Sequence, residues 1–392
     1  MTALLLAALY TSTAQVESVA VSGSVLWAAT AGGVEQYDLA TGIRTRLFTT
    51  ADGLQANHVR SLKMDGVLHA RTDAADCALG EVFSCTRAPP LPAQAPAAVP
   101  CYQGARETAR LRAGGHLIVG TTRGLWLDGR RITPEGQICT NHVHALAEFH
   151  GALWVGAFDA GLCVLEAGRF HAVAAPFRMV NDLHATPQGL WVAAAEGLYF
   201  TADGRSFRRE GRVRERGANR IASNSRSLFV TTPFALYAFR LDQRDLVRRW
   251  AKPAGSTALQ AVTVSGSNVW LASEDAGVIR LRNGRFEAFD RASGLPSSWT
   301  VDVAPAPGGG VWVATLRDGA VRLDARGNVV EHLGDPTRWG LRLYPDRGRM
   351  LFGTQQGLDG AALPDPHVHA LLRTAEGLWA GTEAGLALLD KP

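Results

Sequence analysis

The sequence has few lysines, few cysteines and no long apolar run. Only three of its 40 basic residues are lysine, a bias that we attribute to an arginine- and alanine-rich genome more than to function. The 5 cysteines are an odd number, so the count alone fixes no disulfide pairing. No stretch approaches the roughly 20 apolar residues that a membrane-spanning helix needs, which excludes such a helix.

Familiar catalytic motifs are also missing. The sequence has no Gly-x-Ser-x-Gly elbow, no His-Glu-x-x-His pair, no phosphate-binding loop and no Gly-x-Gly-x-x-Gly after a strand. Acidic residues do recur, but they lie in predicted turns, where Asp satisfies the local backbone. We therefore assign no catalytic residue.

What the sequence does have is a repeat. It is clearest at residues 141–170, where short apolar runs are separated by Gly, Asp or His-Gly, as in consecutive antiparallel strands. A core of apolar, aromatic, apolar and small residues marks each copy. The third residue of each core gives ten markers: Trp27, His69, Ile118, Trp154, Trp191, Phe229, Trp270, Trp312, Phe352 and Trp379. Most intervals are 36 to 42 residues, the period of a four-stranded propeller blade.

This period predicts an all-β protein, a β-propeller. One four-stranded sheet cannot cover both of its apolar faces, so the modules must stack, and closing the stack leaves few bare edges. We predict a single closed ring of four-stranded antiparallel blades over residues 15–392, with about ten modules. The interval from Phe352 to Trp379 shrinks to 27 residues and leaves module nine little room for an outer strand. Eight or nine full blades are therefore an alternative.

Two segments stand apart from the repeat. Residues 1–14 contain a seven-residue apolar run followed by small residues. This fits either a short signal peptide or an outer strand that completes the last module and clasps the ring. Residues 86–101 are a Pro/Ala-rich insertion that cannot supply ladder hydrogen bonds, so we expect an extended surface excursion.

Three cysteines, Cys77, Cys85 and Cys101, flank this insertion. A disulfide among them would tie it down. A metal site is disfavoured there, because Cys-x-x-Cys spacing and a nearby His are both missing. Cys139 and Cys163 are interpreted as buried thiols.

The links between modules resemble a known repeat. Residues 49–59 (TTADGLQANHV) and the later Leu-Trp-x-Gly-Thr cores are similar to the two-component regulator propeller repeat, with Asp-Gly-Leu-x-x-Asn-x-Val followed by Gly-x-Leu-Trp-x-Gly-Thr-x-x-Gly-Leu. Residues 293–298 and 135–143 repeat the link more loosely. The resemblance covers nearly the whole chain and implies a propeller of a family that usually forms extracytoplasmic sensors joined to a membrane segment and a histidine kinase. No part of this sequence resembles a kinase or membrane anchor, so the resemblance implies the fold and not signalling.

Positive charge is concentrated in one segment. Residues 205–252 contain thirteen basic and four acidic residues, a net +9 in a chain of +4. Such a field can attract an acidic glycan, a lipid headgroup, nucleic acid or an acidic protein, or it can be a solvated outer face. Nucleic acid fits least, because no stacking aromatics are interleaved. The candidate binding residues of this basic face are Arg208, Arg209, Arg212, Arg214 and Arg216.

Histidines recur at the starts of predicted first strands. Our alignment puts His58, His142 and His367 in one register and His144, His184 and His369 in another. First strands line the channel of a propeller, so both registers approach one opening, although side-chain alternation sends only one inward. These histidines either cap turns or form a pH-sensitive or metal-binding channel mouth.

Two functions fit these features. The first, which we prefer, is a non-catalytic extracytoplasmic propeller, periplasmic or secreted, that works without a cofactor as a sensor or scaffold. Its partner would be a protein or an anionic glycan. The alternative is a propeller lyase or hydrolase that acts on an anionic glycan at the channel mouth. An enzyme needs a converging acid/base or metal set there, whereas a binding platform needs only aromatic and arginine side chains.

Overall fold

The computed structural model describes residues 4–89, 101–253, 255–361, 363 and 365–389. Within these ranges the chain forms forty β-strands and three short 3-10 turns (Thr50–Asp52, Arg291–Ser293 and Pro307–Gly309), with no α-helix. None of the helical turns in the described ranges is long and apolar enough to cross a membrane. The all-β prediction is confirmed. Most of the predicted 86–101 excursion, residues 90–100, lies outside the described residues.

The strands follow the meander that the repeat predicts. In the clearest copy, β15 (Val143–Phe149), β16 (Ala152–Ala157), β17 (Leu162–Glu166) and β18 (Arg169–Val173) pair in sequence order, all antiparallel. The marker Trp154 lies in the second strand and is only 6% exposed, because it packs between sheets. All ten markers lie in the strand that follows the first long strand of their sheet.

A turn that recurs after several of the cores has a simple cause within this chain. A threonine ends the second strand and donates its hydroxyl to the carbonyl that begins the third, as from Thr30 to Gly33 O (2.8 Å) and from Thr121 to Gly124 O (2.9 Å). Gly33 and Gly124 have φ of 133° and 135°, values that residues with a side chain rarely adopt. The Thr-x-x-Gly spacing is therefore a turn signal.

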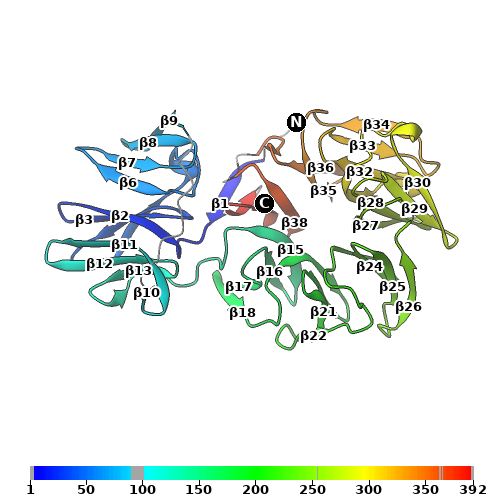
Figure 1. Cartoon of the computed structure of the whole chain (residues 1–392), viewed down its shortest axis with the longest axis horizontal. Helices are drawn as coiled ribbons and strands as arrows, with labels where there is room; N and C mark the ends of the chain where they lie inside the picture. The colour runs from blue at the N-terminus through cyan, green and yellow to red at the C-terminus, as the bar shows by residue number, and fades with distance from the viewer. Residues whose placement is uncertain (1–3, 90–100, 254, 362, 364, 390–392) are drawn as a thin grey trace. The chain divides into compact units, whose positions relative to one another are not determined.

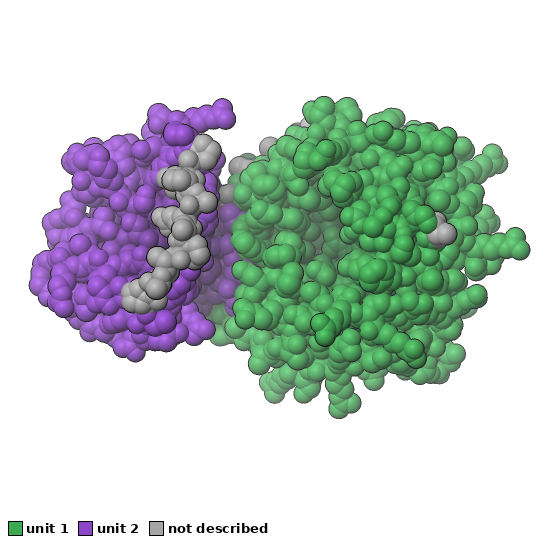
Figure 2. All heavy atoms as spheres, in the orientation of Figure 1, with its two compact units in different colours: residues 1–8, 142–383, 387–392 green, residues 9–141, 384–386 purple. Residues whose placement is uncertain are grey.

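The chain divides into two compact units (Figure 2). Unit 1 comprises Met1–Ala8, His142–Glu383 and Ala387–Pro392, and unit 2 comprises Leu9–Asn141 and Ala384–Leu386.

Unit 1 contains most of the sheets among the described residues. Four four-stranded sheets follow β15–β18. The first two are β19 (Val180–Thr186), β20 (Gly189–Ala194), β21 (Gly197–Thr201) and β22 (Arg208–Arg209), then β23 (Arg220–Ser223), β24 (Ser227–Thr232), β25 (Ala235–Arg240) and β26 (Leu246–Ala251). The next two are β27 (Leu259–Ser265), β28 (Asn268–Ser273), β29 (Val278–Arg282) and β30 (Arg285–Phe289), then β31 (Thr300–Pro305), β32 (Val311–Thr315), β33 (Ala320–Leu323) and β34 (Val329–Leu333). The next sheet has three described strands, β35 (Gly340–Asp346), β36 (Arg349–Thr354) and β37 (Gly357–Leu358). The last has the order β1–β40–β39–β38, from β38 (Val368–Thr374), β39 (Gly377–Thr382), β40 (Gly385–Leu389) and β1 (Leu6–Tyr10).

Two features of these last sheets match sequence expectations. The β35–β37 sheet corresponds to module nine, which was predicted to have little or no outer strand. The outer strand of the last sheet is β1, the position that the clasp interpretation gives to the N-terminal segment. Removal of residues 1–14 as a signal peptide stays an untested prediction.

In unit 1 the first strands pack on one another in the order β15, β19, β23, β27, β31, β35, β38, and β38 packs on β15 (Figure 1). Glycines allow the closest approaches. A Cβ added at Gly156 would lie 2.5 Å from Val180 Cγ1 in the next sheet, and one at Gly381 would lie 2.4 Å from Val143 Cγ1. The last sheet of unit 1 therefore packs on β15–β18 as tightly as sequence-adjacent sheets pack on each other.

Unit 2 contains three sheets in its described residues. They are β2 (Val16–Ser22), β3 (Val25–Thr30), β4 (Gly33–Asp38), β5 (Arg44–Phe48); β6 (Ser61–Met64), β7 (Leu68–Arg71), β8 (Ala75–Leu79), β9 (Phe83–Arg87); and a five-stranded sheet of β10 (Cys101–Tyr102), β11 (Ala105–Ala113), β12 (His116–Thr121), β13 (Gly124–Leu127), β14 (Arg130–Arg131). The β2 sheet lies in the middle and packs on both others.

A single ring through all ten modules is not confirmed. The first three modules form unit 2, and the packing of β38 on β15 leaves them out of the circuit of first strands in unit 1. The reason lies in the close contacts: Val143 takes the place beside Gly381 that a first strand of unit 2 would need in a ten-module ring.

Cysteine pairing follows the sheet register. Cys77 and Cys85 occupy directly paired positions of β8 and β9 and form a disulfide, while Cys101 is a free, exposed thiol. Cys139 and Cys163 are both disulfide-bonded, so their interpretation as buried thiols is wrong.

Candidate functional site

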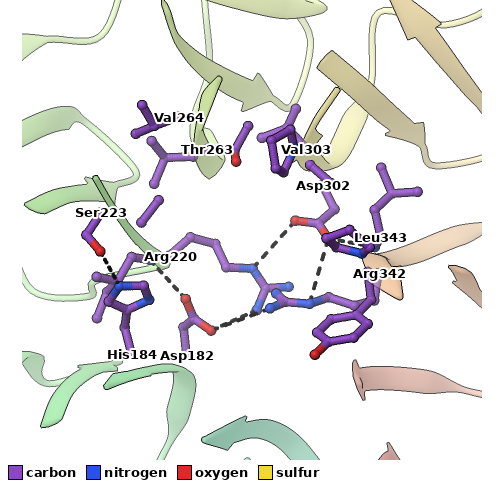
Figure 3. A pocket seen from close by; sticks show the side chains of 17 residues that line it. Asp182, His184, Arg220, Ser223, Thr263, Val264, Asp302, Val303, Arg342 and Leu343 are labelled. Carbon is purple, nitrogen blue, oxygen red and sulfur yellow. Dashed lines mark hydrogen bonds and ion pairs between the residues drawn. The ribbon is translucent and has the colours of Figure 1, made fainter. Parts of the chain in front are cut away.

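A cavity of 260 Å³ opens among the first strands of unit 1 (Figure 3). Its walls come from β19, β23, β27, β31 and β35. Apolar side chains such as Val264 and Val303 line one part of it, and four charged side chains from four different strands converge in another: Asp182, Arg220, Asp302 and Arg342. We call these four residues the charged cluster.

The four residues reach one place because they occupy equivalent positions. Asp182 is paired with Ala193, Arg220 with Thr231, Asp302 with Ala314 and Arg342 with Gly353. Each partner is the next-to-last residue of the second strand of its sheet. Neighbouring first strands place these equivalent positions side by side. Charges of both signs from β19, β23, β31 and β35 therefore meet.

Ion pairs within the charged cluster are long. Asp182 Oδ1 lies 3.7 Å from Arg220 Nη1 and 3.8 Å from Arg342 Nη2. Asp302 lies 3.9 Å from Arg220 Nε and 3.8 Å from Arg342 Nε. These distances exceed those of a charge-assisted hydrogen bond, so attraction holds the groups together while their donors stay available.

The carboxylates are fixed by the backbone of the following sheet. Asp182 Oδ2 accepts a hydrogen bond from Ile221 N (2.9 Å), and Asp302 Oδ2 accepts one from Leu343 N (2.8 Å). Both aspartates are nearly fully buried, with side chains 8% and 5% exposed. Each therefore joins two neighbouring sheets. Asp182 faces both arginines with Oδ1, whereas Asp302 faces Arg220 with Oδ1 and Arg342 with Oδ2.

The guanidiniums are less well satisfied. Arg220 donates from Nη1 to Asn181 O (3.1 Å), whereas Arg342 makes no hydrogen bond with any described residue, and its Nε is buried. Burial and the nearby Arg342 lower the pKa of Arg220, against the opposing effect of Asp302 and Asp182. Burial also acts to lower the pKa of Arg342, but the two carboxylates outweigh it and the net shift is upward. Both side chains stay charged at physiological pH, so Arg342 is a partly buried cation, 22% exposed, with unused donors.

A smaller cavity of 180 Å³ shares Arg220 with the first. It is lined by side chains that can hydrogen-bond, chiefly His144, Asn181, Asn219, Gln260 and His369. His144, Asn181 and His369 each stand one residue before the charged-cluster level of their strands. Asn219 likewise directly precedes Arg220. This polar level is continuous with the charged cluster through Arg220.

Burial favours the neutral form of both histidines of this cavity. Their rings stack with centroids 4.2 Å apart. Burial lowers the pKa of His144 to about 3, because a protonated imidazole there would be desolvated and would be repelled by Arg220 and by a protonated His369. Burial also lowers the pKa of His369, although its hydrogen bond with Glu383 (3.0 Å) opposes the shift. Neutral imidazoles can donate and accept hydrogen bonds at this level without adding charge.

The predicted histidine registers are only partly right. His144 and His369 do share a register, but Asn181, not His184, is their equivalent in β19, because Val180 and Val143 occupy matching paired positions. His184 lines the larger cavity instead and hydrogen-bonds to Ser223 Oγ (2.8 Å); burial lowers its pKa. His58 belongs to unit 2, where it lies 3.4 Å from Glu17.

The remaining two histidines lie outside both cavities, next to acidic residues. His142 Nδ1 is 4.0 Å from Asp159. His367 Nδ1 is 2.8 Å from Asp365 and 3.9 Å from Glu383, and these three residues offer ligand atoms that all lie within 4.8 Å of one another. We call Asp365, His367 and Glu383 the rim cluster. Its two carboxylates and one imidazole are a donor set that suits zinc, so it could hold a metal ion.

The predicted basic face is split by the structure. Arg208, Arg209 and Arg212 line one outer pocket, whereas Arg214 and Arg216 are exposed and do not. Arg220, counted in the same basic segment, points into the charged cluster (Figure 3). The segment is therefore not one uniform solvated face.

Sequence reasoning missed the charged cluster. The available signal was positional: Asp182 and Arg220 stand nine residues before their markers, and Asp302 and Arg342 stand ten before theirs. Other modules have Ala at this position, for example Ala145 and Ala370. Charged residues at an otherwise small, buried position indicate a site.

No family model and no curated protein matches the sequence. Solved structures do. The extracellular domain of BT4673 from B. thetaiotaomicron, described as a one-component system, is 12% identical with a TM-score of 0.53, over 96% of this chain and 70% of that one. PorZ, described as a surface component of the type-IX secretion system of Porphyromonas gingivalis, is 11% identical with a TM-score of 0.56, over 95% and 73%. Streptogramin B lyase is 13% identical with a TM-score of 0.54, over 65% and 95%.

This chain has a β-propeller fold. The antiparallel sheets and these structural likenesses together establish that, and they agree with the resemblance to the two-component regulator propeller repeat. At 11 to 13% identity the likenesses concern the fold alone. What the propeller does must come from its own residues.

Proposed function

We propose that unit 1 is a closed seven-bladed propeller and that it binds a small acidic saccharide between its first strands. In this role the protein is a non-catalytic sensor or scaffold module. The observation that carries the proposal is the guanidinium of Arg342, which faces a cavity and whose buried Nε has no hydrogen-bond partner among the described residues.

A buried N–H donor without a hydrogen bond is costly, and a carboxylate is the partner that a guanidinium fork fits best. Arg220 lies on the same cavity, so one ligand carboxylate can bridge the two arginines. The neutral level of His144, Asn181, Asn219, Gln260 and His369 offers mixed donors and acceptors. Sugar hydroxyls, which both donate and accept, match that level.

The two carboxylates support binding over catalysis. Asp182 and Asp302 each accept a backbone N–H at Oδ2 and lie 3.7 to 3.9 Å from both arginines, an arrangement that holds them as fixed anions. A general acid or base needs a carboxyl group that exchanges its proton with the substrate. One pair suits the enzyme alternative, His184 with Ser223, and it is included in the test below.

An extracytoplasmic location supports this role. The structural neighbours include an extracellular domain and a bacterial surface component. The Cys77–Cys85 disulfide also fits an oxidising compartment. Exposure to external glycans is what a saccharide-binding module requires.

Calorimetry with a uronic acid and with its neutral parent hexose tests the proposal. We expect the wild type to bind the uronic acid more tightly, and Arg342→Gln to weaken that binding by roughly 30-fold or more, as loss of a buried charge partner does. Arg285→Gln is the matched control, because Arg285 is exposed at the β29–β30 turn and carries the same charge. Equal affinity in wild type and Arg342→Gln would refute the site.

The catalytic alternative has its own readout. Incubating the wild type with an acidic oligosaccharide and separating the products by chromatography should show no cleavage. Cleavage that disappears in Ser223→Ala would make the protein an enzyme and assign His184 as its base.

A further inference from the structure

A second pocket lies at the outer edge of unit 1, between the sheets β19–β22 and β23–β26. It has a volume of 240 Å³, and its walls include Arg208, Arg209, Arg212 and Arg244 over the aromatic residues Trp191 and Phe200. It shares no residue with the two cavities among the first strands. We call it the arginine pocket.

Sheet register builds the wall on the β19–β22 side. Trp191 pairs with Phe200, and Phe200 pairs with Arg208, so the three side chains lie in a row on one face. Trp191 and Phe200 are 1% and 8% exposed and form the floor. The indole N–H of Trp191 is buried and has no acceptor among the described residues.

The facing sheet contributes through its β25–β26 turn. Arg244 adopts a left-handed backbone conformation there (φ 58°), and its guanidinium carbon lies 4.3 Å from the ring centroid of Phe200. Its carbonyl accepts a hydrogen bond from Arg212 (2.7 Å). Arg244 is therefore held over the floor, opposite Arg208.

The charges in the pocket are not balanced. Arg212 is neutralised, because Glu210 binds it through two hydrogen bonds of 2.7 Å and Asp245 lies 3.6 Å away. Arg208 and Arg244 form no ion pair with any described carboxylate. Arg209 donates only to a backbone carbonyl, that of Glu196 (3.3 Å). Three cations are left for a ligand.

We propose that the arginine pocket binds the sulfate or carboxylate groups of an acidic polysaccharide. Arg208 and Arg244, from facing sheets, clamp one oxyanion, because a guanidinium presents paired donors that match its oxygens. Nucleic acid is the poorer fit: the aromatic rings are covered, so bases cannot stack on them as single-stranded nucleic acid requires. This site is independent of the cavity proposed above.

The test compares two double variants that remove the same charge. Arg208→Ala with Arg244→Ala empties the pocket, whereas Arg214→Ala with Arg216→Ala removes two exposed cations of the same segment outside it. Binding of dextran sulfate, polygalacturonate, neutral dextran, inorganic sulfate and duplex DNA is measured by calorimetry at low and at physiological salt. Melting temperature and circular dichroism report folding of each variant.

We expect dextran sulfate or polygalacturonate to bind the wild type, more weakly at higher salt, and neutral dextran not to bind. The pocket variant should lose roughly 10- to 100-fold in affinity, and the control variant about 2-fold or less. If the pocket variant is misfolded, Arg208→Gln alone serves, since that side chain has no described ion pair to lose.

Three results would overturn the proposal. Equal losses of polysaccharide affinity in the two double variants would show that binding depends on the overall positive charge of the basic segment and not on the arginine pocket. Duplex DNA binding as tightly as either polysaccharide, with the same loss in the pocket variant, would reject the glycan class. Binding of inorganic sulfate alone would show an anion site without a polysaccharide partner.

Discussion

The contact between Gly381 and Val143 decides whether unit 1 closes on itself. These residues belong to the last and first sheets of the circuit of first strands, far apart in sequence. A Cβ on Gly381 would lie 2.4 Å from Val143 Cγ1 and 3.1 Å from Val143 O. The first distance is far inside van der Waals contact, and a valine methyl so close to the backbone cannot swing away.

The expected energies follow from this geometry. Gly381→Ala should destabilise the protein by about 1–3 kcal/mol through overpacking, reduced by about 0.5 kcal/mol because alanine restricts the unfolded chain. Val143→Ala should cost about 1–3 kcal/mol, because two methyl groups leave a fully buried position. In the double variant the shorter side chain makes room for the new methyl. The double variant should therefore lose less stability than the two single variants added together, by about 1 kcal/mol or more.

Urea denaturation of the four proteins, followed by circular dichroism, measures this coupling. Gly156 and Val180 provide the matched control, since an added Cβ there would lie 2.5 Å from Val180 Cγ1 between two sheets that are adjacent in sequence. Closure predicts similar coupling in both cycles. Coupling at Gly156 and Val180 together with strict additivity at Gly381 and Val143 would refute the closed circuit.

Three further predictions can be checked on the same protein. Replacing Cys77 and Cys85 by serine should cost about 2.5 kcal/mol in urea denaturation, from the loop entropy of a separation of 8 residues; unchanged stability would contradict this. Because burial lowers the pKa of His144 to about 3, the unfolded chain takes up its proton first as pH falls below about 6.5. The free energy of unfolding should drop by up to about 2 kcal/mol by pH 5. An equal drop in His144→Gln would show that other groups than His144 cause it. Calorimetry should detect Zn²⁺ binding to the rim cluster that is lost in His367→Ala and kept in His142→Ala; no heat in the wild type would leave His367 as a turn residue.

The strands and turns of this fold were readable from sequence because local chemistry fixes them. The Asp-Gly-Leu link illustrates this. Thr49 and Asp52 cap each other's backbone around a 3-10 turn, Gly53 ends it at φ 91°, and Asn57 accepts from Thr50 N (2.8 Å). These backbone contacts all lie between residues 49 and 57, so this part of the pattern is a local sequence signal.

Sheet order is different, because nothing local encodes which faces meet. Gly120 in the third sheet packs against Val16 in the first, with an added Cβ 2.7 Å from Val16 Cγ1. Gly381 packs against Val143 in the same way. Both pairs have the same composition as Gly156 and Val180, so the sequence offers several equivalent partners. A continuous repeat therefore predicted a continuous ring, whereas tertiary packing divides the modules between two units.

The charged cluster was missed for a reason that also explains its chemistry. The first strands of its aspartates carry a β-bulge just before them, between Val180 and Asp182 and between Thr300 and Asp302. Asp182 and His184 are two residues apart and both line the larger cavity, as strand alternation requires. The sequence analysis aligned the first strands on their histidines and therefore passed over Asp182. At the same place a side chain leaves the packing between sheets and faces the cavity, where charge is tolerated if it finds a partner. The level of these four residues is thus the one at which this propeller can vary its ligand, and Arg342, whose contacts with Asp182 and Asp302 are long ion pairs of 3.8 Å, is the residue there with donors left for a ligand.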